Sequence, residues 1–328
     1  MVRRYLLYIQ IVVLVFALAL CAGAATVSDV VNLVDRSSYT NYLNNDLYTH
    51  NGDTRVIGST QHNLAMANIS SVFGGFGLST TYNTGTFGGV GYSNVVGVLQ
   101  GTTNPNDIYL VGGHYDSVAA GPGADDNASG TAGVLEAARV LSQFSFQATI
   151  VFVAFDSEEA GLIGSQGYMQ SHSTDNILGM ISMDMIAYNP TGVRHNYASI
   201  MGRPASNSVK QGLADAMALY GNGLIANQYG PLDGSDQAPF EWAGKPACLL
   251  IEDAISAGGG NPYYHSASDS VDTANYIDYI YATNMTRSTV GYLANSAGLI
   301  AVPEPGSLAA IGGGLVWLVV VIRRRRIE

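Results

Sequence analysis

Five residues in this chain carry side chains that bind metal ions well, and each stands at the end of a hydrophobic run. They are His114, Asp126, Glu159, Asp184 and His265. Two imidazoles and three carboxylates form a nitrogen and oxygen donor set that suits zinc, with cobalt or manganese as substitutes. A further carboxylate, Glu158, stands beside one of them. Metal ions together with a free general base are the equipment for activating water.

Each motif taken alone also has a structural explanation. A single histidine after a strand is usually structural, although Asp116 could accept a hydrogen bond from the imidazole of His114 and fix its tautomer. The segment GADDNASG around Asp126 is also typical of a turn and helix cap. The pair Glu158 and Glu159 could be the acidic first turn of a helix. The interpretation as a metal site therefore rests on the whole set.

Hydrophobic runs in the middle of the chain predict buried strands. The runs cover residues 93–99, 108–112, 148–155, 177–183 and 247–251. The spacing of apolar residues predicts helices over 129–143, 204–220 and 273–297, and Ser129 or Asn127 is the expected N-cap of the first. The stretch before residue 90 is rich in glycine, asparagine and threonine, and its pattern assigns no elements.

Strands that alternate with helices predict a single α/β domain, with three layers (α/β/α) around a central, largely parallel or mixed sheet. In such sheets, ligands bind at the carboxyl ends of the strands. His114, Glu159 and Asp184 each stand just after a predicted strand. The sequence therefore predicts that these three side chains share one site.

The composition indicates a large core and excludes one class of partner. Of the 328 residues, 47% are hydrophobic and 12% are charged. Between residues 25 and 302 there are 8 basic and 23 acidic residues, a net charge of −15, which repels nucleic acid. Of the two cysteines, Cys21 lies in the N-terminal apolar run, and Cys248 is expected to be a buried packing residue.

Both ends of the chain carry patterns typical of membrane targeting. Residues 1–24 contain two arginines, an apolar run and the small residues AGA, and they read as a secretory signal peptide. Near the other end, VPEPG at 302–306 precedes an apolar run at 308–322 and four arginines at 323–326. These arginines are expected to stay in the cytoplasm, which places the body of the protein outside it. An uncleaved anchor at either end is the alternative.

The C-terminal pattern resembles the PEP-CTERM sorting signal of bacteria that produce exopolysaccharides. The resemblance implies recognition and cleavage by an exosortase-type enzyme. The expected organisation is a signal peptide at 1–24, a catalytic domain at 25–300 and a sorting and membrane-anchoring segment at 301–328. The expected location is the cell surface or extracellular matrix, with the chain anchored in the membrane through its C-terminus before processing.

From about residue 93 to 272 the chain resembles metallopeptidase family 28, the aminopeptidase S and aminopeptidase Y family of di-zinc exopeptidases. The resemblance rests on the motifs GGHYDS, GPGADDNASG, DSEEAGLIGS, SMDM, SDQAPFEWAGKPA and YYHSASD. It implies two Zn²⁺ per chain. One would be held by His114 and Asp184, the other by Glu159 and His265, and Asp126 would bridge them. It also implies a cis peptide bond after Asp126.

The chain departs from the family pattern at Gln237 and Ser266, where the family often has His and Thr, but neither is an expected ligand. Glu158 is the expected general base, which takes a proton from water and delivers it to the leaving amine. Nearby carboxylates and partial burial would raise its pKa toward the working pH. Tyr264 is expected either to donate a hydrogen bond to the oxyanion, as in some relatives, or to serve in packing.

An acidic pocket that includes Glu158 and Asp184 suits a free α-amino group, so an aminopeptidase acting on peptides or proteins with a free N-terminus is expected. The alternatives are a carboxypeptidase or a single-zinc glutaminyl cyclase on the same fold. A non-catalytic binding domain, like receptor ectodomains of the superfamily, is a further alternative. The presence of all five ligands favours two metal ions and argues against that last reading.

Overall fold

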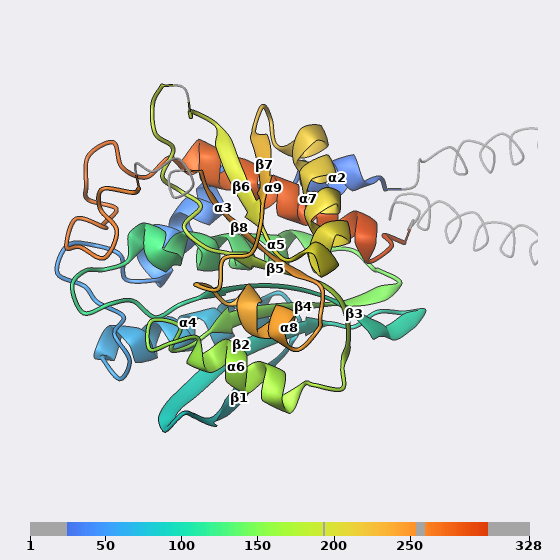
Figure 1. Cartoon of the computed structure of the whole chain (residues 1–328), viewed down its shortest axis with the longest axis horizontal. Coiled ribbons are helices and arrows are strands. Elements are labelled where there is room, and N and C mark those ends of the chain that lie inside the picture. Colours follow the sequence, from blue (N-terminus) through green and yellow to red (C-terminus); the bar gives the residue numbers. More distant parts are fainter. Residues whose placement is uncertain (1–24, 193, 254–259, 301–328) are drawn as a thin grey trace, which may run out of the picture. The chain divides into compact units, whose positions relative to one another are not determined.

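The computed structural model describes residues 25–192, 194–253 and 260–300. Residues Val27–Leu299 form one compact unit built around a sheet of eight strands (Figure 1). The expected signal peptide at 1–24 and the expected sorting segment at 301–328 lie outside the described residues. Within the described part of the chain, no helix is both long and apolar enough to cross a bilayer.

The sheet is mixed, and its strand order is β1-β2-β4-β3-β5-β8-β6-β7. The strands are β1 Ser79–Phe87, β2 Val90–Leu99, β3 Asn104–His114, β4 Ala148–Phe155, β5 Asn176–Met183, β6 Tyr197–Met201, β7 Ile225–Tyr229 and β8 Ala247–Glu252. The neighbours β4, β3, β5 and β8 run parallel, whereas β1 with β2, β2 with β4 and β6 with β8 pair antiparallel. The carboxyl ends of the four central strands therefore meet at one edge.

Helices and short helical turns precede, connect and follow these strands (Figure 1). The helices are α2 Val27–Val31, α3 Arg36–Asn41, α4 Thr60–Gly75, α5 Gly130–Leu141, α6 Ile163–Ser171, α7 Asn207–Tyr220, α8 Gln237–Trp242 and α9 Tyr279–Ser296. The turns are η1 Tyr42–Asp46, η2 Ala124–Ser129 and η3 Pro204–Ser206.

Alternating side chains of the central strands enter two separate cores. In β3, Val111 joins the core that includes α4, α5, α7 and α9. Its neighbour Leu110 joins the core that includes Tyr168 of α6 and Phe240 of α8. Every residue of β4 is buried, as expected for a strand covered on both faces. The three-layer α/β/α fold with a mixed central sheet is confirmed.

The five predicted strands correspond to β2, β3, β4, β5 and β8, and β4 has the predicted bounds. The predicted helix at 129–143 corresponds to α5. Of the two candidate caps, Asn127 is the one whose side chain acts, since its Oδ1 accepts from the backbone N–H of Gly130 at 2.9 Å. Cys248 is buried in β8, and this burial raises the pKa of its thiol, in agreement with a packing role.

The helix predicted at 273–297 begins too early. The helix α9 starts at Tyr279, because the side chain of Asp278 accepts hydrogen bonds from the first free N–H groups of the helix. The stretch before residue 90 contains α2, α3, α4 and β1, none of which the apolar pattern had indicated. The predicted helix at 204–220 is divided into η3 and α7.

Candidate metal centre

The carboxyl ends of neighbouring parallel strands bring the five ligand candidates together. His114 ends β3, Glu159 follows β4 and Asp184 follows β5. Asp126 lies in η2, just before α5, and His265 lies in the loop before α9. Because β3, β4 and β5 are parallel neighbours, their ends open onto the same edge of the sheet.

The donor atoms fall into two groups. The first contains His114, Glu158 and Asp184, and the second contains Asp126, Glu159 and His265. Within each group, the ligand atoms lie within 4.8 Å of one another. Each group therefore contributes one imidazole and two carboxylates.

The carboxylate of Asp126 lies between the two imidazoles. Its Oδ1 is 3.3 Å from Nε2 of His114, and its Oδ2 is 3.1 Å from Nε2 of His265. His265 Nε2 also lies 3.2 Å from Glu159 Oε2, and His114 Nε2 lies 3.8 Å from Asp184 Oδ1. One oxygen of Asp126 thus faces each group, which is the placement required of a bridging ligand.

Some of these oxygens have no donor from the protein. Oε1 of Glu159 and Oδ1 of Asp184 are buried without a hydrogen bond. Leaving carboxylate oxygens buried and unpaired is costly, and no Lys or Arg is among the described residues that line the cavity beside these groups. Imidazole nitrogens and carboxylate oxygens at these separations, with unpaired oxygens among them, fit a divalent cation such as zinc.

The carboxylates of the cluster differ in the direction in which their surroundings shift their pKa values. Burial raises the pKa of Glu158 well above its usual range, and the charge of Asp236 raises it further. Burial also raises the pKa of Glu159, to about 7. Burial has the same tendency at Asp126, but hydrogen bonds from His114 and His265 outweigh it and lower the pKa to about 2. Of these three carboxylates, Asp126 is therefore the one held most firmly in its ionised form.

Asp116 supports two segments at once. Nδ1 of His114 lies 3.3 Å from the backbone carbonyl oxygen of Asp116 and 3.4 Å from its carboxylate Oδ1. The two carboxylate oxygens accept from the backbone N–H groups of Glu158 and Glu159, each at 3.1 Å. The buried Asp116 therefore fixes the turn that presents both glutamates, a role that the sequence did not indicate.

Two further side chains hold η2 in place. The carboxylate of Asp269 accepts from the backbone N–H groups of Asp125 and Asp126, at 2.7 and 3.1 Å. Asn127 donates from Nδ2 to the carbonyl of Met183, the last residue of β5, at 2.9 Å. The peptide bond between Asp126 and Asn127 is cis. The role of Asp269 was not predicted from the sequence, although this residue ends the YYHSASD motif that contains His265.

The loop before α8 supports Asp184 from behind. Ser235 donates from Oγ to Oδ2 of Asp184 at 2.6 Å. Asp236 is fully buried, and burial raises its pKa to about 7. Gln237, the departure from the family pattern, is buried and donates to the carbonyl of Leu232. The motif SDQAPFEWAGKPA was the available signal for Ser235 and Asp236.

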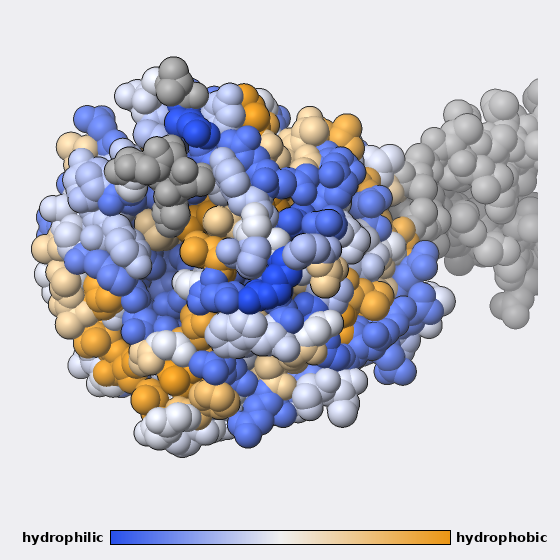
Figure 2. Space-filling model, in the orientation of Figure 1, coloured by the Kyte–Doolittle hydropathy of each residue, from blue (hydrophilic) through white to orange (hydrophobic). Residues whose placement is uncertain are grey.

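A cavity of about 210 Å³ opens onto the cluster. Apolar residues line one side of it: Met185, Leu232, Leu249 and Ile251. Tyr264 also lines it, is half-exposed, and stacks on the imidazole of His265 with the ring centroids 3.8 Å apart. On the face shown in Figure 2, apolar residues form small groups separated by polar ones. The lining of the cavity thus combines the charged cluster with a group of apolar residues, which we call the apolar wall.

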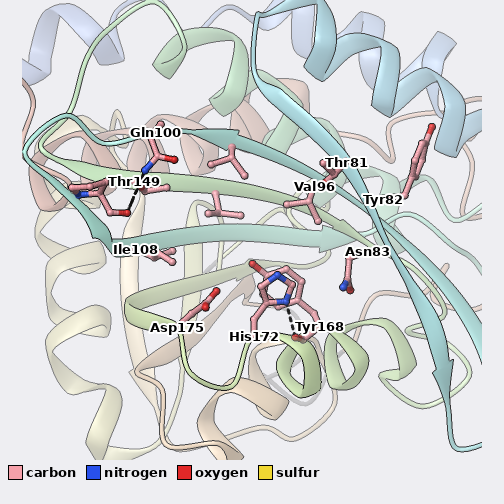
Figure 3. Close-up of a pocket in the computed structure, with 13 residues that line it drawn as sticks. Thr81, Tyr82, Asn83, Val96, Gln100, Ile108, Thr149, Tyr168, His172 and Asp175 are labelled. Atoms are coloured by element: carbon pink, nitrogen blue, oxygen red, sulfur yellow. Dashed lines mark hydrogen bonds between the residues drawn. The ribbon is translucent and has the colours of Figure 1, made fainter.

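A larger cavity, of about 400 Å³, lies elsewhere on the sheet (Figure 3). Val96, Ile108 and Val151 line it from the strands, and His172 and Asp175 are its only imidazole and carboxylate. This is not the arrangement that binds a metal ion, so the smaller cavity is the candidate site.

A parallel-strand edge with clustered imidazoles and carboxylates fits a metal-dependent hydrolase of the α/β class. A model of peptidase family M28 matches residues 94–289, which is more than half of the chain. The chain belongs to this family.

The curated relatives carry the names of peptidases. A "Probable zinc metalloprotease" of Pyrenophora teres f. teres is 42% identical over 107 residues, 30% of this chain and 23% of the relative. "Aminopeptidase YwaD" of Bacillus subtilis is 30% identical over 183 residues, 55% of this chain and 40% of the relative. "Leucine aminopeptidase 1" of Ajellomyces capsulatus is 29% identical over 223 residues, 62% and 57%. The matches thus span 23% to 57% of these relatives' lengths.

Solved structures share the fold. An aminopeptidase from Aneurinibacillus sp. strain AM-1 superposes with a TM-score of 0.70 at 19% identity and covers 85% of this chain and 98% of its own. A glutaminyl cyclase from Porphyromonas gingivalis superposes with a TM-score of 0.68 at 19% identity, covering 80% and 99%. The fold alone therefore does not distinguish between these two activities.

Proposed function

We propose that this protein is an exported zinc aminopeptidase with two metal ions in its active site. The observation that carries the proposal is the position of Asp126, whose two carboxylate oxygens face His114 and His265 separately. Membership of peptidase family M28 supports the same reading. In this proposal, His114 and Asp184 hold one zinc ion, Glu159 and His265 hold the other, and Asp126 bridges them.

Bound zinc supplies Lewis acidity, which polarises a peptide carbonyl and makes water reactive near neutral pH. The protein supplies the base. Glu158 remains free when its neighbour Glu159 serves as a ligand, and burial raises the pKa of Glu158. Its carboxylate can then take a proton from water and deliver it to the leaving amine.

Tyr264 is placed to assist at the mouth of the cavity. Partial burial raises the pKa of its phenol, so the group stays protonated at neutral pH and can donate a hydrogen bond. In the proposed reaction, it donates to the oxygen of the carbonyl under attack. Its stacking on His265 keeps the ring beside the cluster.

The lining of the cavity favours an amino terminus as the anchored end of the substrate. Four carboxylates line it, and its lining residues include no Lys or Arg that could bind a carboxylate terminus. Glu158, which is not a zinc ligand in this proposal, can therefore bind a positively charged α-amino group, whereas a C-terminal carboxylate meets no positively charged side chain among these residues. The apolar wall formed by Met185, Leu249 and Ile251 favours substrates whose first side chain is apolar.

Two other activities remain as alternatives. A carboxypeptidase would need a cation near the cavity. A glutaminyl cyclase has the same fold, as the structural comparison illustrates, and would use one zinc ion. Asp126 with carboxylates on both sides favours two ions over one. A non-catalytic receptor-like domain is the least favoured, because every ligand is present.

The export route is part of the proposal. Residues 1–24 would act as a signal peptide and residues 25–300 as the catalytic domain. Residues 301–328 would act as a PEP-CTERM segment, which anchors the chain in the membrane until an exosortase-type enzyme cleaves it. The mature protein would then act at the cell surface or in the extracellular matrix on peptides or proteins with a free N-terminus.

Hydrolysis of aminoacyl-arylamides, with and without an N-acetyl group, tests the proposal directly. The purified protein should cleave the free substrates, best with apolar residues, and a chelator should abolish cleavage. N-acetylated substrates should not be cleaved. A zinc-loaded protein that cleaves none of them would refute the aminopeptidase activity and direct the assays to carboxypeptidase and cyclase substrates.

A further inference from the structure

Two side chains from the segment before the family match reach both loops that carry the ligand candidates. The segment at 54–62 precedes residues 94–289, which the family model covers. Arg55 lies just before α4, and His62 lies in its first turn. Their exposed fractions are 0% and 4%. A guanidinium is costly to bury unless its donors are paired, so its contacts show which segments it stabilises.

The Arg55 guanidinium connects both ends of the loop at 115–123. Its Nε donates to the carbonyl of Tyr115, directly after β3, at 2.6 Å. Its Nη2 donates to the carbonyl of Gly123, directly before η2, at 2.8 Å, and its Nη1 donates to the carbonyl of Pro122. Because the group is planar and rigid, these bonds fix the distance between the end of β3 and the start of η2.

The loop is closely packed at its second end. A Cβ on Gly123 would lie 2.2 Å from the backbone oxygen of Asp126. The backbone there is left-handed, with φ at +62°, which glycine adopts without strain. The Gly123 carbonyl also accepts from the backbone N–H of Ala128 in η2 at 3.1 Å, so a shift of this carbonyl would disturb the turn that contains Asp126. Arg55 holds the position of that carbonyl.

His62 holds the second loop. Its Nε2 lies 2.8 Å from Oδ1 of Asp156, the residue between β4 and the turn that presents Glu158. The other oxygen of Asp156 accepts from the backbone N–H of Ser93 at 2.7 Å. The imidazole of His62 stacks on Tyr115 with the centroids 5.0 Å apart, so it also touches the residue that Arg55 binds.

We propose that Arg55 and His62 form a brace that positions the two ligand-bearing loops and thereby sets the affinity of the protein for its metal ions. Both are positioning residues: Arg55 acts on His114 and Asp126 through the loop between them, and His62 acts on the two glutamates through Asp156. The inference rests on the proposed metal centre and adds to it the part of the chain before the family match.

Zinc affinity, measured by competition with a chelator, tests the brace. Arg55→Lys keeps the charge but cannot donate to both ends of the loop, and His62→Asn removes the reach to Asp156. We expect each to weaken zinc binding about 10- to 100-fold, the usual effect of losing a group that orients a metal ligand. Activity should fall at limiting zinc and recover largely at saturating zinc.

The chain offers a matched control for each variant. Arg287 also donates to backbone carbonyls, those of Tyr220 and Val31, so Arg287→Lys is the control for Arg55→Lys. His50 lies 2.9 Å from Asp272 in an exposed pair, so His50→Asn is the control for His62→Asn. Both controls should keep zinc affinity within about twofold of the wild type.

Thermal unfolding of the metal-free proteins separates positioning from folding. If Arg55→Lys does not fold, His62→Asn and Ser117→Ala carry the test, since Ser117 accepts from the backbone N–H of Arg55 at 2.9 Å. Wild-type zinc affinity in the folded brace variants would overturn the brace, even if their Tm fell. A wild-type protein that binds no zinc would refute the metal centre itself, and with it the brace.

Discussion

The strands β3 and β4 begin at one cavity and end at another, and the two cavities differ in character. Near their amino ends, Ile108 and Val151 line the larger cavity, of about 400 Å³ (Figure 3). At their carboxyl ends, His114 and Glu158 line the smaller one, of about 210 Å³. The smaller cavity has four carboxylates in its lining, and the larger has one.

The difference follows from the direction of the strands. At the carboxyl ends of parallel strands, loops leave the sheet and can turn polar side chains toward a common point. Along the strands themselves, alternate side chains are committed to the core on each face. Cavity volume is therefore a poor guide to chemistry in this molecule, and the convergence of charge from separate segments is a better one.

The largest expected effect comes from the same substitution made in each cavity. His114→Asn removes the imidazole of one ligand group and should weaken zinc binding by more than about 100-fold, beyond the loss expected from an orienting group alone. Hydrolysis should fall with it. His172→Asn, in the larger cavity, should leave zinc binding and hydrolysis within about twofold of the wild type. Equal effects of the two substitutions would show that the smaller cavity is not the specific site of metal binding.

The next effect separates metal binding from catalysis within the smaller cavity. Glu158→Gln preserves the shape of the side chain but cannot accept a proton. It should therefore lower kcat about 10²- to 10⁴-fold while zinc content stays unchanged. Glu159→Gln should lose zinc as well. Full activity in Glu158→Gln, assayed with known zinc content, would remove Glu158 from the role of base.

A smaller effect is expected from hydroxyl groups that support each cavity. Ser235 donates to Asp184 at 2.6 Å, so Ser235→Ala should lower zinc affinity about tenfold by freeing that carboxylate. Thr149 lines the larger cavity and donates to the carbonyl of Pro105 at 2.8 Å. Thr149→Val should change stability without changing zinc affinity. Isothermal titration measures the zinc affinity of both variants, and thermal unfolding measures their stability. Equal zinc affinity in the two variants would contradict the role of Ser235.

The smallest effect concerns how a buried carboxyl group near the metal centre changes the stability of the fold with pH. Glu252 ends β8 and is fully buried, and burial together with the nearby Asp125 raises its pKa well above the usual 4.5. The folded state therefore binds its proton more tightly than the unfolded state. Its contribution to stability is fully present below about pH 4.5 and is lost as the pH rises toward its folded pKa.

Glu252→Gln should reduce the fall in the Tm of the metal-free protein between acidic and alkaline pH by a few degrees, at about 2–4 °C per kcal/mol. Thr149→Val, in the larger cavity, removes no titratable group, serves as the control and should leave the pH dependence of Tm unchanged. A pH dependence that is the same in Glu252→Gln and wild type would show that this acid carries no such cost.

The elements that hold the ligands could be predicted because their signals are local. An apolar run such as 148–155 identifies a buried strand, and a polar residue at its end then faces a known edge of the sheet. The supports could not be predicted in this way. Asp269 binds the backbone of Asp126 from 143 residues away in sequence, and Ser235 binds Asp184 from 51 residues away. The motifs SDQAPFEWAGKPA and YYHSASD contain these two residues, but a local motif does not show which distant group each side chain contacts.

The elements before residue 90 could not be predicted for a related reason. In α4, polar residues stand between the buried ones, so the apolar pattern is weak. Arg55, just before α4, and His62, in its first turn, are polar but buried. Their hydrogen bonds are made with a carbonyl and a carboxylate from segments distant in the sequence. Residues of this kind read as surface positions until the segments around them are brought together.

Titration of the metal-free protein with zinc, while hydrolysis of a leucyl-arylamide is followed, tests the central claim most directly. We expect two zinc ions to bind per chain and full activity to require both. Saturation and full activity at one zinc ion per chain would contradict the bridging position of Asp126 and point to a single-metal enzyme.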